Sequence, residues 1–175
     1  MKTDFIAIAQ QQFKTYKGLG EKAMSQTQDA NLFVQAHPDS NSIAIVVQHL
    51  WGNMLSRWTD FLTTDGEKEW RKREEEFEPI LQTRAAVLAQ WEEGWQCLFN
   101  ALEGLNETDL SRVIYIRGEA HSVTEAIARQ LTHYAYHVGQ IVFISRMLNT
   151  SDFQSLSIPK GGTAAYNQEK FKEKQ

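Results

Sequence analysis

The chain has 175 residues, of which 42% are hydrophobic and 23% are charged, and it contains only ten glycines and three prolines. This length suits a single domain, the balance excludes a disordered or collagen-like chain, and the scarcity of turn residues disfavours an all-β fold. One cysteine excludes an internal disulfide and suits a reducing compartment, and a net charge of −4 without a basic block argues against nucleic acid as a partner.

Two helices are predicted in the first part of the chain. Apolar residues at steps of three and four predict a helix over residues 2–25. A loop around Pro38 ends in residues that can cap a helix, so a second helix is predicted over residues 42–63.

The third helix is predicted over residues 79–103, because proline is well tolerated in the first turn, where its missing N–H has no partner to lose.

The fourth helix has the clearest start. Ser122 and Glu125 fit an S-x-x-E capping box, which predicts a helix over residues 122–149. Before it, β-branched and aromatic residues between Arg112 and Ala120 predict a short extended segment or hairpin. Residues 150–175 are predicted to form a loop and a frayed tail. The expected fold is all-α, with one domain over residues 1–175 that forms a four-helix bundle with a long third connection.

The segment between the second and third predicted helices is strongly charged. Residues from Asp65 to Glu76 carry charges of alternating sign. We interpret this segment as a solvated connector, and a ligand-binding loop is the alternative.

Two of the five histidines stand out by their spacing. His133 and His137 are four residues apart in a predicted helix, so they share one face and could bind the same metal ion. A third ligand must come from another helix, and His49 in the second helix is the natural candidate. The alternative is that all three are ordinary core histidines. His37 and His121 are expected at the surface.

Two common metal sites do not fit the sequence. The residue after His133 is Tyr134, so the glutamate of the H-E-x-x-H metalloproteases is missing. A ferritin-like di-iron centre would need Glu-x-x-His pairs on two helices, which the sequence lacks.

Two segments around these histidines resemble the DinB/YfiT-like metalloenzyme superfamily. The first runs from Ile45 to Lys68, and the second comprises residues 116–119, 124–127 and 133–141. The resemblance covers nearly the whole chain and points to a branch classed as a domain of unknown function.

The resemblance carries expectations about the site. It implies a four-helix bundle in which His49, His133 and His137 hold one divalent metal ion, and homodimers are common in the superfamily. Three neutral imidazoles would leave a coordination position open, which is typical of catalytic sites. We expect zinc or nickel, with iron or copper as alternatives. Relatives that use thiols suggest a low-molecular-weight thiol as a further cofactor.

The predicted function is a metal-dependent enzyme, either a thiol-dependent transferase or a hydrolase, that acts on a small molecule. The alternative is a non-catalytic, stress-associated, dimeric metal-binding bundle. Four further residues are candidates for positioning the metal or the substrate: Arg57, Glu125, Tyr136 and Gln140.

The second predicted helix is also the basis for expecting a homodimer. Its apolar surface is too wide for one neighbouring helix, so we expect Trp51 and Trp58 to face a second subunit, with burial under the connector and tail as the alternative. No apolar run approaches the roughly 20 residues that span a bilayer. The residues after Met1 lack the apolar stretch of a signal peptide, so we expect a cytoplasmic protein without membrane contact.

Overall fold

The structure is a computed structural model that describes residues 4–149 and 153–172. It is mostly helical, with a small two-stranded sheet between the third and fourth helices. The α-helices of the described residues are α1 (Phe5–Ser25), α2 (Ile43–Trp58), α3 (Arg84–Glu103), α4 (Val123–Leu148) and α5 (Thr163–Lys172). Within these residues, no helix combines the length and the apolar character needed to cross a membrane.

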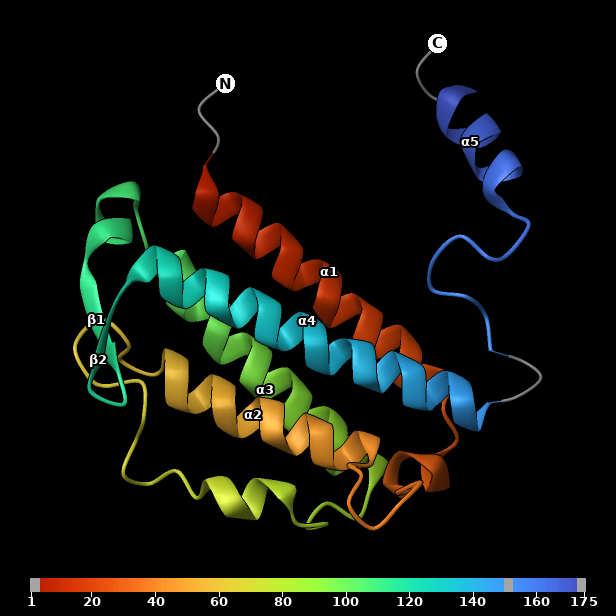
Figure 1. Cartoon of the computed structure of the whole chain (residues 1–175), viewed down its shortest axis with the longest axis horizontal. Coiled ribbons are helices and arrows are strands. Elements are labelled where there is room, and N and C mark those ends of the chain that lie inside the picture. Colours follow the sequence, from red (N-terminus) through yellow and green to blue (C-terminus); the bar gives the residue numbers. More distant parts are fainter. Residues whose placement is uncertain (1–3, 150–152, 173–175) are drawn as a thin grey trace.

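Four long helices lie side by side, with α1 and α4 running in one direction and α2 and α3 in the other (Figure 1). The main helix contacts pair α1 with α4 and α2 with α3, and α2 also packs on α4. Residues 59–83 form a long connector that returns along the molecule before α3 begins, which is why the consecutive helices α2 and α3 are parallel. The connector therefore passes beside α2 and can contribute side chains to its polar face.

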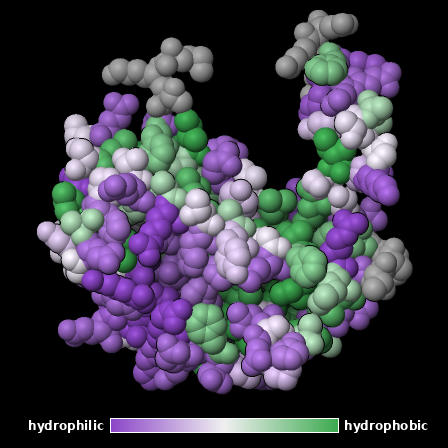
Figure 2. Space-filling view, in the orientation of Figure 1, coloured by the Kyte–Doolittle hydropathy of each residue, from purple (hydrophilic) through white to green (hydrophobic). Residues whose placement is uncertain are grey.

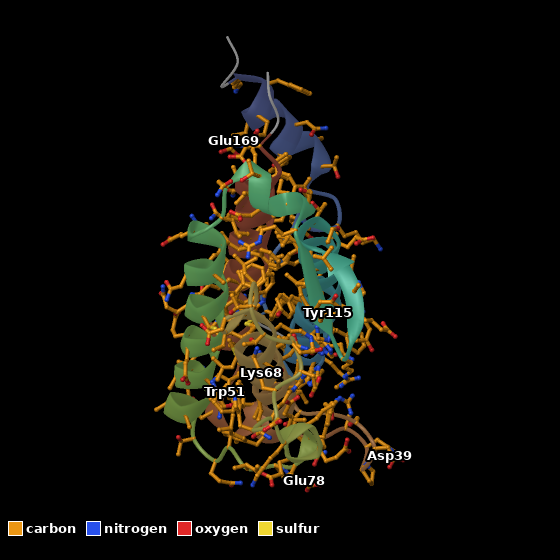
Figure 3. All side chains as sticks on the ribbon, turned by 90° about the vertical axis from the view of Figure 1, so that its left-hand side faces the viewer. Asp39, Trp51, Lys68, Glu78, Tyr115 and Glu169 are labelled. Atoms are coloured by element: carbon orange, nitrogen blue, oxygen red, sulfur yellow. The ribbon has the colours of Figure 1, made fainter. Side chains whose placement is uncertain are left out.

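The core between the helices is rich in aromatic residues, and side chains fill the interior (Figure 3). A buried chain of hydrogen bonds crosses it from α2 to α4. The Trp58 Nε1–H donates to the Tyr134 hydroxyl at 3.0 Å, and this hydroxyl donates to Asn53 Oδ1 at 3.1 Å. Because unpaired polar groups are costly in a core, this chain specifies how α2 and α4 pack against each other.

The local signals for the fourth helix and the hairpin are confirmed. The Ser122 hydroxyl accepts from the backbone N–H of Glu125, and the Glu125 carboxylate accepts from the N–H of Ser122, which completes the capping box of α4. The predicted extended segment is an antiparallel hairpin of β1 (Val113–Ile116) and β2 (Glu119–Ser122). Its two turn residues have positive φ angles, as a tight two-residue hairpin turn requires.

Three predicted helix boundaries need correction. α2 ends at Trp58 and not at residue 63, because Asp60 adopts a φ of 49°, which is incompatible with a continuing helix. α3 begins at Arg84 and not at residue 79, because the Thr83 hydroxyl caps it by accepting from the N–H of Ala86. α1 begins at Phe5, and residues 2 and 3 of its predicted range lie outside the described residues.

The predicted tail contains a helix, so the expectation of an entirely irregular tail was wrong. α5 extends away from the other helices (Figure 1), and none of its residues is buried. Residues 150–152 and 173–175 of the predicted tail lie outside the described residues.

The structure also contradicts the argument for a dimer through the second helix. Trp58 is only 3% exposed, and its ring packs against those of Phe13 and Phe61. Trp51 is half-buried, and its Nε1–H donates to Glu93 of α3 at 2.8 Å. Apart from Trp51 and Leu55, every residue of α2 is buried, because α3, α4 and the connector cover it from several sides.

Asp65 joins the connector to the hairpin. Its carboxylate accepts hydrogen bonds from the backbone N–H groups of Glu67 at 2.7 Å, Arg117 at 2.8 Å and Gly118 at 2.8 Å. Burial acts to raise the pKa of Asp65, but these backbone donors outweigh it and hold the pKa below its usual value. The ionised carboxylate is therefore the form that the fold stabilises.

We expect Asp65→Ala to lower the free energy of unfolding by about 1–2 kcal/mol, because three backbone donors lose a charged acceptor. Urea unfolding at pH 7 measures this loss, with exposed Asp39→Ala as the unchanged control. Since the folded pKa is depressed, the contribution of Asp65 is present above its unfolded pKa of about 3.9 and is lost as the pH falls below it. Equal stability of both variants at pH 7 would contradict this role.

Candidate metal centre

The three histidines predicted as ligands lie together. His49 comes from the middle of α2, and His133 and His137 come from successive turns of α4. Their ligand nitrogens all lie within 4.8 Å of one another. The Nε2 atom of His133 is 3.1 Å from Nε2 of His137 and 3.4 Å from Nε2 of His49. The packing of α2 on α4 thus forms one compact cluster, which we call the histidine cluster.

The outer nitrogen of His49 is held by a carboxylate. Nδ1 of His49 lies 2.9 Å from Oε2 of Glu76, and both side chains are almost fully buried. A carboxylate can only accept, so Nδ1 carries the proton and Nε2 keeps a lone pair directed at the cluster. This histidine–carboxylate pairing is the usual support of a metal-binding imidazole.

The other two histidines have amide partners from their own helix. Nδ1 of His133 donates to Oε1 of Gln130 at 3.3 Å, and Nδ1 of His137 donates to Oε1 of Gln140 at 2.7 Å. Each partner is three residues away, so the α-helix itself brings the donor and the acceptor together. In this arrangement all three Nδ1–H groups point outward, and the three Nε2 lone pairs point at one another.

Such an arrangement suits a cation. With the protons on Nδ1, the Nε2 atoms cannot hydrogen-bond to each other, and their lone pairs repel. Zinc–imidazole bonds of about 2.0–2.1 Å in tetrahedral geometry place two ligand nitrogens about 3.3 Å apart. The separations of 3.1 and 3.4 Å are close to this value. The donor set therefore fits one divalent ion.

The protonation state also suits coordination. Burial, together with the neighbouring histidines His137 and His49, lowers the pKa of His133 to about 3. Burial and the proximity of His49 lower the pKa of His137 to about 4. Both imidazoles are consequently neutral at pH 7, which is the form that binds metals.

Glu76 and Arg71 were not predicted as part of the site. The Arg71 side chain is 2% exposed and binds the Glu76 carboxylate through Nε–H at 2.7 Å and Nη2–H at 2.9 Å. Burial acts to raise the pKa of Glu76, but His49 and Arg71 outweigh it and keep the carboxylate ionised. The interpretation of the charged segment as a solvated connector was therefore wrong at these two residues.

Of the four further candidate residues, three lie at or beside the histidine cluster and one does not. Gln140 supports His137, and its Nε2 donates to the hydroxyl of Tyr136 at 3.2 Å. Arg57 lines a cavity beside the cluster. Glu125, in contrast, lies two turns before His133 and serves in the capping box of α4.

The two remaining histidines do not join the cluster. His37 is exposed in the loop before α2, as expected. His121 lies on β2 with a side chain that is 21% exposed, so it is more buried than the sequence suggested.

Gly52 leaves room for Glu76 to reach His49. A β-carbon on Gly52 would lie 2.4 Å from Oε1 of Glu76 and 2.7 Å from its carboxyl carbon, far closer than atoms can approach. Only a residue without a side chain therefore allows this carboxylate to pack against α2 beside His49.

We expect Gly52→Ala to weaken metal binding by about tenfold or more, because it displaces the carboxylate that orients His49. A competition titration with a chromogenic chelator measures the affinity. Gly139→Ala is the matched control, since a β-carbon there meets no atom within 4 Å. Unchanged affinity in Gly52→Ala would show that Glu76 does not support the site.

The fold and the cluster define a helical protein with a group of three histidines, two buried and one half-buried, whose nitrogens converge. The family described as "Protein of unknown function (DUF1572)" matches residues 1–162, and the chain belongs to this family. This agrees with the prediction of a domain of unknown function. A search of curated proteins finds no match to the chain.

Proposed function

We propose that this protein is a metal-dependent enzyme of the DinB/YfiT-like type, in which His49, His133 and His137 hold one divalent ion. The observation that carries the proposal is the orientation of the three rings. Each Nδ1–H is bound outward, and the Nε2 atoms converge at 3.1 and 3.4 Å. The four long helices, with a long connector before α3 and a hairpin before α4, support the DinB-like bundle.

The protein contributes ligands of fixed orientation. Glu76, Gln130 and Gln140 each accept the Nδ1–H of one histidine, which holds the three rings in place before an ion binds. A divalent ion bound there supplies Lewis acidity to a substrate. Imidazole ligands favour zinc or nickel, with iron or copper as alternatives.

A cavity of about 420 Å³ favours the enzyme over the non-catalytic alternative. The histidine cluster forms part of its wall, so a small molecule in the cavity would reach the ion. A structural zinc site would instead be closed by four protein ligands. We therefore propose a thiol-dependent transferase or a hydrolase that acts on a small molecule in this cavity.

A cobalt-substituted sample tests the proposal. We expect metal-free protein to bind one Co²⁺ per chain and to give the intense visible absorption of a low-coordinate ion. Addition of cysteine as a small thiol probe should change this absorption by adding a thiolate-to-cobalt charge-transfer band, because one position is open. Lack of Co²⁺ binding would refute the metal site. A spectrum that is insensitive to cysteine would favour the closed, non-catalytic alternative.

A homodimer and a cytoplasmic location remain part of the proposal. Large exposed apolar residues of the described chain are absent from α2, but three of them lie along the second half of α4, where Figure 2 shows an apolar patch. Tyr136, Phe143 and Met147 are 63%, 68% and 41% exposed. We propose that this face, rather than Trp51 and Trp58, meets the second subunit, and sedimentation of Phe143→Ser beside wild type tests it.

The free thiol of Cys97 agrees with the reducing compartment of the proposed cytoplasmic location.

A further inference from the structure

The cavity beside the histidine cluster is unusually rich in positive charge. None of its described lining residues is acidic, and Figure 2 shows a broad hydrophilic area over α2 and the connector. Figure 3 shows side-chain nitrogen atoms gathered close to the labelled Lys68 and Tyr115. Five of the lining residues are arginines: Arg57, Arg71, Arg73, Arg117 and Arg129. This concentration contrasts with the net charge of −4 for the whole chain.

Two of these arginines are buried at the base of the cavity. Arg57 is 8% exposed, and the side chain of Arg71 is 2% exposed. Arg57 donates to the carbonyl oxygen of Gly66. Burial, and then the nearby charge of Arg71, lower the pKa of Arg57. The fold therefore holds two like charges close together in a poorly solvated place, which is costly unless anions compensate them.

The carboxylates of the protein compensate these charges only in part. Glu67 alone lies near three guanidinium groups, at 3.3 Å from Arg57, 3.6 Å from Arg71 and 3.0 Å from Arg117. Glu76 is shared between Arg71 and His49. Three arginines thus form ion pairs with only two carboxylates, one of which also serves a histidine, and Asp65 adds an electrostatic interaction with Arg57 without a direct ion pair.

Arg129 adds a charge without compensation. It lies on α4, one turn before His133, and is exposed at the wall of the cavity. Its guanidinium forms no ion pair or hydrogen bond with any other side chain in the described part of the chain. Arg117 is 55% exposed at the rim and pairs with Glu67 through Nε, so two exposed guanidinium groups line the cavity with N–H donors left for a molecule inside it.

One apolar side chain, Phe77, also lines the cavity. The ring of Phe77 stacks on the imidazole of His49 with centroids 4.9 Å apart, and the guanidinium of Arg73 lies 5.2 Å from the centre of the Phe77 ring. A ligand with a carbon skeleton could pack on this ring while its charged end meets the arginines. The volume of about 420 Å³ is in the range of small-molecule sites.

We infer that this cavity binds a small organic molecule through an oxyanion group, a carboxylate or a phosphate, which Arg117 and Arg129 contact beside the histidine cluster. Guanidinium groups suit both anions, because their planar N–H donors match two oxygens at once. The inference rests on the proposed function in one respect, because it names the substrate class of the proposed enzyme. Binding of the anion itself does not need the metal.

Calorimetric titration of metal-free protein at low ionic strength tests the inference. Inorganic phosphate and malonate are the two probes, and removing the metal prevents either from binding to an ion instead of the arginines. We expect saturable binding of at least one probe at one site per chain, and the stronger probe identifies the type of oxyanion. Lack of binding of both probes would overturn the inference.

Two variants on the same helix locate the site. Arg129→Gln is expected to weaken binding by about tenfold, through the loss of a charge-assisted contact. Arg146→Gln removes the same charge from an exposed position of α4 outside this cavity and should leave binding unchanged. Equal weakening in both variants would show general charge attraction and overturn the inference.

A zinc titration of the same samples separates this inference from the proposed function. Arg129→Gln should bind one zinc ion as wild type does, because it removes no ligand. Anion binding without zinc binding would support the cavity inference and refute the metal site. Zinc binding in wild type without binding of either anion would leave the metal site and overturn this inference.

Discussion

Replacement of any one of His49, His133 and His137 by alanine is expected to lower the affinity for a divalent ion by about 100-fold or more. Each single variant keeps only two imidazoles, and the described cluster contains no thiolate or carboxylate ligand to replace the third. The fold should persist, because burial of the apolar helix faces supplies most of its stability. Elemental analysis after mild dialysis measures the metal content, and circular dichroism measures the helix content.

The control for this series is His37→Ala, which removes an exposed histidine outside the cluster and should keep the wild-type metal content. The outcomes also separate the ligands. If His49→Ala kept its metal while His133→Ala lost it, α2 would not supply the third ligand. If all three variants matched wild type, the histidines would be ordinary core residues.

Replacement of Glu76 by alanine is expected to cause a large loss of stability, about 3–5 kcal/mol in the metal-free protein. The reason is that Arg71 is buried and would lose its main carboxylate partner, while Nδ1–H of His49 would lose its acceptor. Urea unfolding measures this loss. Glu76→Gln should be less harmful, because its amide oxygen can still accept from His49, although it lacks the charge for Arg71.

A double variant separates the stability role of Glu76 from its role at the metal. Glu76→Leu combined with Arg71→Met removes both buried charges, so the stability should recover most of what Glu76→Ala loses. Metal affinity should remain at least about tenfold weaker than in wild type, because His49 still lacks its support. Wild-type stability of Glu76→Ala would contradict the buried ion pair, and wild-type affinity of the double variant would contradict the support of His49.

The features predicted well from the sequence depend on short spacings. Ser122 and Glu125 are three residues apart and His133 and His137 are four apart, so helix geometry alone brings each pair together. His49 could be predicted because it is a polar residue in a strongly apolar helix. Its partner Glu76 lies 27 residues away among several similar glutamates, and no local pattern distinguishes it from Glu75.

The errors arose where a local preference competed with tertiary contacts. Pro79 favours a helix start, but Thr83 provides the cap that α3 uses. Trp58 was expected at a subunit interface because the apolar surface of α2 is wider than one neighbouring helix can cover. Several elements cover α2 in the structure, and the Nε1–H of Trp58 has its hydrogen-bond acceptor, the Tyr134 hydroxyl, inside the core. This coverage depends on the path of the connector, residues 59–83, along α2, and the periodicity of apolar residues does not predict that path.

The hydrogen-bond chain from Trp58 through Tyr134 to Asn53 also determines the geometry of the proposed metal site. Tyr134 follows a predicted ligand, and Asn53 lies one turn after His49, so the chain and the cluster share the same two helices. Sliding α2 along α4 by one turn, about 5.4 Å, would leave all of these buried groups unpaired, at about 1–3 kcal/mol each. The chain therefore fixes the register of α2 against α4, and with it the positions of His49, His133 and His137 relative to one another. At the proposed metal site we therefore expect ions that accept imidazole ligands to bind more tightly than Ca²⁺, which prefers oxygen ligands.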